Sequence, residues 1–112
     1  MRVITNSSPF GSRARTQVLL MLQLLSESYP RELARLLDLS LSGVQKALVS
    51  LERDGLVAAR AMGRTRLYRL NPRAFARQEL VRYLDRLLEP ETELRVRAAT
   101  LRRRPRRTGK PL

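Results

Sequence analysis

The chain contains no cysteine and no histidine. Without cysteine it can form neither a disulfide nor a thiolate metal site, and without histidine it lacks the usual general base and the commonest transition-metal ligand. The sequence also shows no glycine-rich phosphate cradle, no paired-carboxylate motif and no aspartate cluster suited to Mg²⁺ or Ca²⁺. We therefore expect a protein that is not an enzyme, requires no cofactor and has no metal site.

The sequence also has few aromatic residues and no long apolar run, which limits the kinds of binding partner to expect. Aromatic residues make up only 4% of the chain, so the base-stacking surface that single-strand binders use is missing. The longest apolar run, residues 18–22 resuming at Leu24, is too short to span a bilayer, and no apolar signal-peptide core follows Arg2. We expect a cytoplasmic protein that has no membrane partner.

Acidic residues are scarce relative to basic ones: 23 Lys and Arg residues stand against 10 Asp and Glu residues, a net charge of +13. Both residues 1–72 and residues 73–112 carry a basic excess. Such an excess favours a polyanionic partner, and duplex DNA or RNA is the commonest one. With 112 residues, 43% of them apolar, the chain is expected to fold as one small domain.

The spacing of apolar residues predicts a first helix from the N-cap Ser12 to about Leu25. This helix is apolar almost all round at residues 18–25, which is more than one core face absorbs. We therefore expect a second subunit to cover its other face. Residues 1–9 lack periodicity and are interpreted as a flexible arm.

Two short helices are predicted next, after a one- or two-residue strand at Ser28 and Tyr29. Pro30 suits the first turn of a helix that stops near Asp38, and Ser40 caps the helix that follows. The second helix has apolar positions at i, i+3, i+4 and i+7, and Gly55 is its expected left-handed stop. The core positions are Val44, Ala47, Leu48 and Leu51. Two helices joined by about three residues form a helix-turn-helix.

A hairpin and two further helices are predicted in the rest of the chain. Residues 57–61 and 65–70 alternate like paired strands around a turn at residues 62–64, and Asn71-Pro72 ends the hairpin. A helix is expected from Arg73 to about Leu88, ended by Pro90, with another from about Glu91 to Arg103. The basic tail, residues 102–112, is expected to be disordered.

Three segments of the sequence resemble winged helix-turn-helix regulators of the ArsR-like kind. These are "FGSRARTQVLLMLQLL", "RELARLLDLSLSGVQKALVSLERDGLV" and "RTRLYRLNP", and the likeness covers about residues 10–88. It is particularly close to small regulators found beside or fused to nucleotidyltransferases. ArsR-like metal sensors use Cys and His ligands, which this chain lacks, so metal sensing is not implied. A nucleotidyltransferase motif is also missing.

The resemblance implies a mainly α fold with a small β-hairpin, a winged helix-turn-helix with extra N- and C-terminal dimerisation helices. Residues 1–9 would be a flexible arm, residues 10–88 the winged-helix domain with its C-terminal helix, and residues 89–112 a basic, partly disordered extension. The implied function is a homodimeric, sequence-specific regulator of transcription that binds double-stranded DNA, expected to be a repressor. An adaptor for a separate nucleotidyltransferase or toxin-like protein is the alternative, and an RNA-binding role is a third possibility.

The predicted DNA-binding surface has two main parts. The second helix of the helix-turn-helix, between Ser40 and Gly55, would be the recognition helix, and its polar face offers donors for base edges and phosphates, with an apolar Val49 among them. Its candidate residues are Ser42, Gly43, Gln45, Lys46, Val49 and Arg53. The hairpin tip gathers arginines around a glycine, at Arg60, Gly63, Arg64 and Arg66. Each part is also open to the plainer interpretation of a solvated, charged surface.

Further candidates lie outside these two parts. Additional phosphate contacts are expected at Arg13, Arg15, Arg31 and Ser40. The long apolar stripe of the helix expected from Arg73, together with the overly apolar first helix, predicts a dimer interface. Its candidate residues are Val18, Leu22, Phe75, Leu80, Leu84 and Leu87.

Overall fold

The structure is a computed structural model that describes Val3 and residues 8–103. Its elements in chain order are α1 (Arg13–Leu25), β1 (Glu27–Ser28), α2 (Pro30–Leu37), α3 (Leu41–Arg53), β2 (Val57–Met62), β3 (Thr65–Leu70), α4 (Arg77–Leu88) and α5 (Thr92–Arg103). The three strands form one antiparallel sheet in the order β1-β3-β2. The predicted fold class, a mainly α winged helix-turn-helix with a small hairpin, is confirmed.

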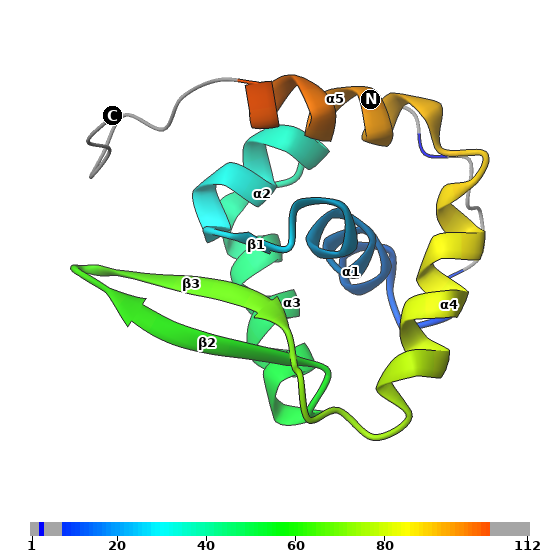
Figure 1. The fold of residues 1–112 in the computed structure, drawn as a ribbon. Coiled ribbons are helices and arrows are strands. Elements are labelled where there is room, and N and C mark those ends of the chain that lie inside the picture. The colour runs from blue at the N-terminus through cyan, green and yellow to red at the C-terminus, as the bar shows by residue number, and fades with distance from the viewer. Residues whose placement is uncertain (1–2, 4–7, 104–112) are drawn as a thin grey trace.

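Helix α1 runs through the centre of the molecule, and the other helices surround it (Figure 1). It begins where the Ser12 hydroxyl accepts a hydrogen bond from the Arg15 amide at 3.1 Å, as its role as N-cap predicts. It ends at Ser26, which has a φ of 76° and whose amide donates to the Leu22 carbonyl at 2.8 Å. Helices α2, α3, α4 and α5 all contact α1.

The all-round apolar surface of α1 is covered by the chain itself. Five consecutive residues, 18–22, are fully buried within the single chain. The prediction that a second subunit covers one face of this helix is therefore wrong, because α4 and α5 pack on that face instead. Full burial of one such side chain contributes roughly 1.5–3 kcal/mol, so these five residues contribute substantially to the stability of the core.

The helix-turn-helix forms as predicted. Helix α2 ends at Asp38, whose backbone is left-handed with a φ of 55°. The Ser40 hydroxyl then accepts from the Gly43 amide at 3.0 Å and starts α3. Gly55 follows α3 with a φ of 80°, the left-handed conformation that favours glycine after a helix.

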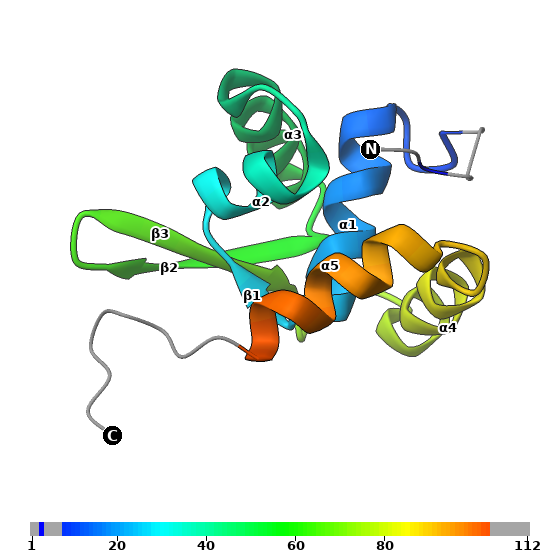
Figure 2. The ribbon, with the colours of Figure 1, turned by 90° about the horizontal axis from the view of Figure 1, so that it is seen from above.

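The hairpin is the wing of the fold and projects away from the side that carries α4 (Figures 1 and 2). The strands pair from Val57 with Leu70 to Met62 with Thr65, so the turn consists of Gly63 and Arg64. Strand β1 adds to β3 at residues 27–28, one residue earlier than predicted.

Asn71 attaches the base of the wing to the end of α3. Its amide donates to the Leu56 carbonyl at 2.9 Å, and its side-chain Nδ2 donates to the Gly55 carbonyl at 2.9 Å. The backbone and the side chain of Asn71 thus both connect the base of the wing to the segment that follows α3. Helix α3 and the hairpin are thus held together at this point.

Helix α4 starts at Arg77, four residues later than the predicted Arg73. The Asn71 side chain accepts from the Arg73 amide at 2.9 Å, and the Asn71 carbonyl accepts from the Ala74 amide at 3.1 Å. These bonds hold the chain in a turn, and Ala76 is left-handed with a φ of 57°. Local side-chain hydrogen bonds of this kind compete with helix formation, which explains the late start.

Helix α5 belongs to the same folded unit as the winged helix. Leu94 and Ala98 are buried in the common core, and Arg97 donates to the Leu36 carbonyl of α2 at 2.8 Å. Helix α5, which lies in the predicted basic extension 89–112, therefore packs into the same core as the winged-helix elements. Of the basic tail predicted to be disordered, residues 102–112, Arg102 and Arg103 belong to α5, and residues 104–112 lie outside the described residues. Of the predicted arm, residues 1–9, residues 1–2 and 4–7 also lie outside them.

Within the part of the chain that the structure describes, none of the helices has both the length and the apolar content needed to cross a membrane.

Candidate nucleic-acid interface

Helix α3 presents a polar face to solvent and an apolar face to the core, as its sequence spacing predicts. The four apolar positions Val44, Ala47, Leu48 and Leu51 are buried. The opposite face is exposed and consists of Ser42, Gln45, Lys46, Val49 and Arg53. Because its apolar side is anchored against α1 and α2, the helix presents this face as a rigid surface.

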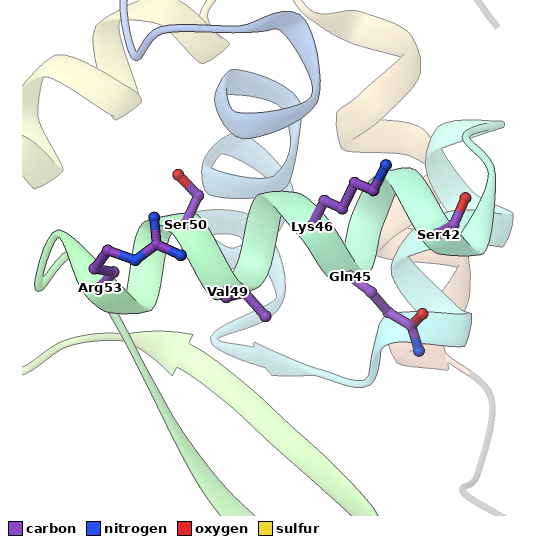
Figure 3. Close-up of a pocket in the computed structure, with 6 residues that line it drawn as sticks. All are labelled: Ser42, Gln45, Lys46, Val49, Ser50 and Arg53. Atoms are coloured by element: carbon purple, nitrogen blue, oxygen red, sulfur yellow. The ribbon is translucent and has the colours of Figure 1, made fainter.

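A shallow hollow of about 490 Å³ lies along this exposed face. Figure 3 shows its six lining residues, of which five were predicted and Ser50 was not. Lys46 and Ser50 lie along one edge of the helix, whereas Gln45 and Val49 point to the other (Figure 3). Ser50 was missed because its position lies at the margin of the exposed face, where helical spacing alone does not assign it to either side.

The start of α3 explains the glycine at position 43. A Cβ atom there would lie 2.9 Å from the Ser40 hydroxyl oxygen, closer than real contacts allow. A larger residue would therefore displace the hydroxyl that caps the helix. The expected phosphate contact at Ser40 competes with this capping role, and the Ser40 and Ser42 hydroxyl oxygens are themselves 3.5 Å apart.

The arginines of the wing differ in how they are held. Arg60 pairs with Glu27 at 3.5 Å, and Arg66 pairs with Glu52 at 3.2 Å. Arg64 occupies the exposed turn beside Gly63, whose φ is 61°. Exposed ion pairs contribute about 0–1 kcal/mol, so Arg60 and Arg66 can exchange a carboxylate for a phosphate at small cost.

Arg15 does not belong to the exposed surface, and the expectation of a phosphate contact there is corrected. Its side chain is only 17% exposed, and its guanidinium lies 2.8 Å from the Asp54 carboxylate. It also donates to the Ser50 hydroxyl and to the Phe10 carbonyl. Arg15 thus joins the start of α1 to the last turns of α3. Arg13 and Arg31, in contrast, are exposed.

The residues predicted to form a dimer interface fall into three groups. Val18, Leu22 and Leu84 are fully buried within the single chain, so the expectation that they face a partner is corrected. Leu80 and Leu87 are partly buried against the same core. Phe75 is 97% exposed, in the turn before α4. The apolar stripe of α4 serves mainly its own domain, which the spacing by itself does not distinguish from an interface.

The chemistry of the described residues is that of a binding surface. Among them, no group of three or more acidic, histidine or cysteine residues could hold a metal ion. Cations, amides and hydroxyls instead project from α3 and the wing, and all of these groups can donate hydrogen bonds to nucleic acid.

Comparison with known proteins identifies the family. No family model and no curated protein sequence matches the chain. Among solved structures, reduced HlyU from Vibrio cholerae is 36% identical, with a TM-score of 0.57 over 68% of this chain and 77% of HlyU. The chain belongs to the ArsR-like winged-helix transcription regulators.

Two other solved structures share the fold of this ArsR-like regulator. A ZitR variant from Lactococcus lactis is 24% identical, with a TM-score of 0.54 over 73% of this chain and 65% of ZitR. The adhesin competence repressor AdcR from Streptococcus pyogenes is 21% identical, with a TM-score of 0.50 over 81% of this chain and 77% of AdcR. These two likenesses concern the fold alone.

Proposed function

We propose that this ArsR-like regulator binds duplex DNA in a sequence-specific manner and represses transcription by occupying a promoter. The exposed face of α3 is the observation that carries the proposal, because it gathers hydrogen-bond donors on a helix whose opposite, apolar side is buried. A helix of this width fits the major groove of B-DNA, where base edges can be distinguished.

The side chains of α3 have distinct proposed roles. The Gln45 amide can donate to and accept from an adenine edge, and Lys46 reaches a guanine or a phosphate. Ser42, in the first turn, donates to a phosphate beside the positive end of the helix dipole. Arg53, in the last turn, contacts the backbone on the other side of the groove. Gly43 permits close approach of the backbone to DNA.

The wing supplies affinity that does not depend on sequence. Arg64 at its tip enters the minor groove or contacts the phosphate backbone beside it. Arg60 and Arg66 add phosphate contacts when they leave their carboxylate partners. Arg13 and Arg31, both exposed, are further phosphate contacts. Each contact displaces counterions from the DNA, so the affinity falls as the salt concentration rises.

The active form is proposed to be a cytoplasmic homodimer. A two-fold axis would place two α3 helices about 34 Å apart, one turn of DNA, and would require an inverted-repeat site. Of the predicted interface residues, Phe75, Leu80 and Leu87 retain exposed surface for this contact.

An adaptor role is the second candidate, in which the domain binds a separate nucleotidyltransferase or toxin-like protein. A groove of about 440 Å³ between α2 and α5 favours it, together with the 57% exposure of Val96 at its edge. Copurification separates the two candidates. A stable heteromer without affinity for duplex DNA supports the adaptor and contradicts the proposed repressor.

Binding-site selection from random duplex DNA at physiological salt tests the proposed function. The expected outcome is enrichment of one inverted repeat whose half-sites are one helical turn apart. The same duplex, placed over a promoter, should lower transcription when the protein is present. Selection that enriches no sequence, with equal affinity for every duplex, contradicts the proposal.

A further inference from the structure

Val49 is an apolar residue in the middle of the polar face of α3. Its side chain is 52% exposed and lies in the hollow between the polar residues of that face (Figure 3). Among the described residues, it belongs neither to the buried core nor to the apolar side chains packed against that core. Valine is also a poorer helix former than alanine, so helix stability does not favour it at this position.

The position of Val49 relates it to the base contact proposed for Gln45. The two residues are four apart on α3, so they lie on the same face, one helical turn or about 5.4 Å along the axis. Successive base pairs of B-DNA are about 3.4 Å apart. Val49 therefore faces a base pair no more than about two steps from the one that Gln45 contacts.

The major groove offers such a side chain only one apolar group, the 5-methyl of thymine. Opposite a G·C pair, the valine would shield the guanine acceptors and the cytosine amino group from water without replacing their hydrogen bonds, which is unfavourable. We propose that Val49 is a specificity-determining residue that selects a thymine within two base pairs of the adenine contacted by Gln45. This inference rests on the proposed binding of duplex DNA.

The same contact would distinguish DNA from RNA. Uracil lacks the 5-methyl group, and the major groove of A-form RNA is too deep and narrow for side chains to read. A duplex RNA of the selected sequence should therefore bind only through its phosphates, without the contribution of Val49.

Removal of single methyl groups from the DNA tests the inference with the wild-type protein. Each thymine of the selected half-site is replaced in turn by deoxyuridine, which removes only the methyl group. One replacement, within two base pairs of the adenine at Gln45, should weaken binding about fourfold, the factor expected for burial of one methyl group. The other replacements should leave the affinity unchanged.

A double-mutant cycle assigns the effect to Val49. Val49→Ala should weaken binding to the thymine duplex and should no longer distinguish thymine from deoxyuridine at that position. Gln78→Ala is the control, because Gln78 is an exposed, uncharged residue of α4 and should keep both the affinity and the fourfold discrimination of the wild type.

Three results would overturn the inference. A selected half-site without thymine at the predicted position, unchanged affinity after every deoxyuridine replacement, or full discrimination retained by Val49→Ala would each do so. In all three cases a selected duplex still binds, so the proposed function stands. A protein that selects no duplex overturns the proposed function and this inference together.

Discussion

Replacement of Arg15 by methionine removes a connection between α1 and the recognition helix while keeping the aliphatic stem. The guanidinium donates to the Phe10 carbonyl, the Ser50 hydroxyl and the Asp54 carboxylate. Ser50 belongs to the last turn of α3, 35 residues further along the chain, and Asp54 directly follows the helix. Arg15→Met should therefore destabilise the fold and loosen the end of α3.

The decrease in the free energy of unfolding can be estimated from the three interactions that Arg15 loses. The two bonds to uncharged oxygens contribute about 1 kcal/mol each. The pair with Asp54 adds at most about 1 kcal/mol, because that carboxylate is 51% exposed and its charge is screened by water. We expect the free energy of unfolding to fall by about 2–3 kcal/mol, a decrease of roughly 10 °C in Tm for a domain of this size.

Urea unfolding followed by circular dichroism measures this change, with Arg13→Met as the control. Arg13 lies two residues earlier on the same helix and is exposed, so its replacement should change the free energy by less than about 0.5 kcal/mol. Because Arg15 is occupied within the fold, Arg15→Met should leave the salt dependence of DNA binding unchanged. Equal stability of the two variants would refute the assigned role of Arg15.

Three further outcomes are expected. Lys46→Ala and Arg64→Ala should each lower the slope of log Kd against log salt by about one unit, and unchanged slopes would remove these residues from the phosphate-binding surface. Gln45→Ala should weaken discrimination at one base pair by about 1–3 kcal/mol without changing that slope, whereas unaltered base preference would contradict base contact. Leu94→Ala should lower the free energy of unfolding by about 2–5 kcal/mol in a single urea transition, and a separate transition for α5 would show that it is not part of the core.

Local spacing was sufficient to predict the elements that position the candidate site. The i, i+3, i+4, i+7 pattern of α3 determines which side chains can be buried, and the buried set is the predicted one. Ser12, Ser40 and Gly55 are also found in the capping positions that their chemistry favours. In each case the decisive interactions join residues only a few positions apart.

Contacts between residues far apart in the sequence could not be predicted from local spacing. The apolar surface of α1 indicates how much must be buried, but not that α4 and α5 bury it. Arg15 looked like other surface arginines, because its partners at Ser50 and Asp54 are near it only in the folded chain. Leu84 likewise fitted an interface as well as a core, since both bury an apolar stripe.

An NMR titration of the labelled protein with the selected duplex tests the central claim most directly. The account predicts that the largest changes in amide chemical shift fall on the exposed face of α3, from Ser42 to Arg53, and on the turn at Gly63 and Arg64. Changes confined to α4 and α5, with α3 and the wing unaffected by saturating DNA, would contradict it.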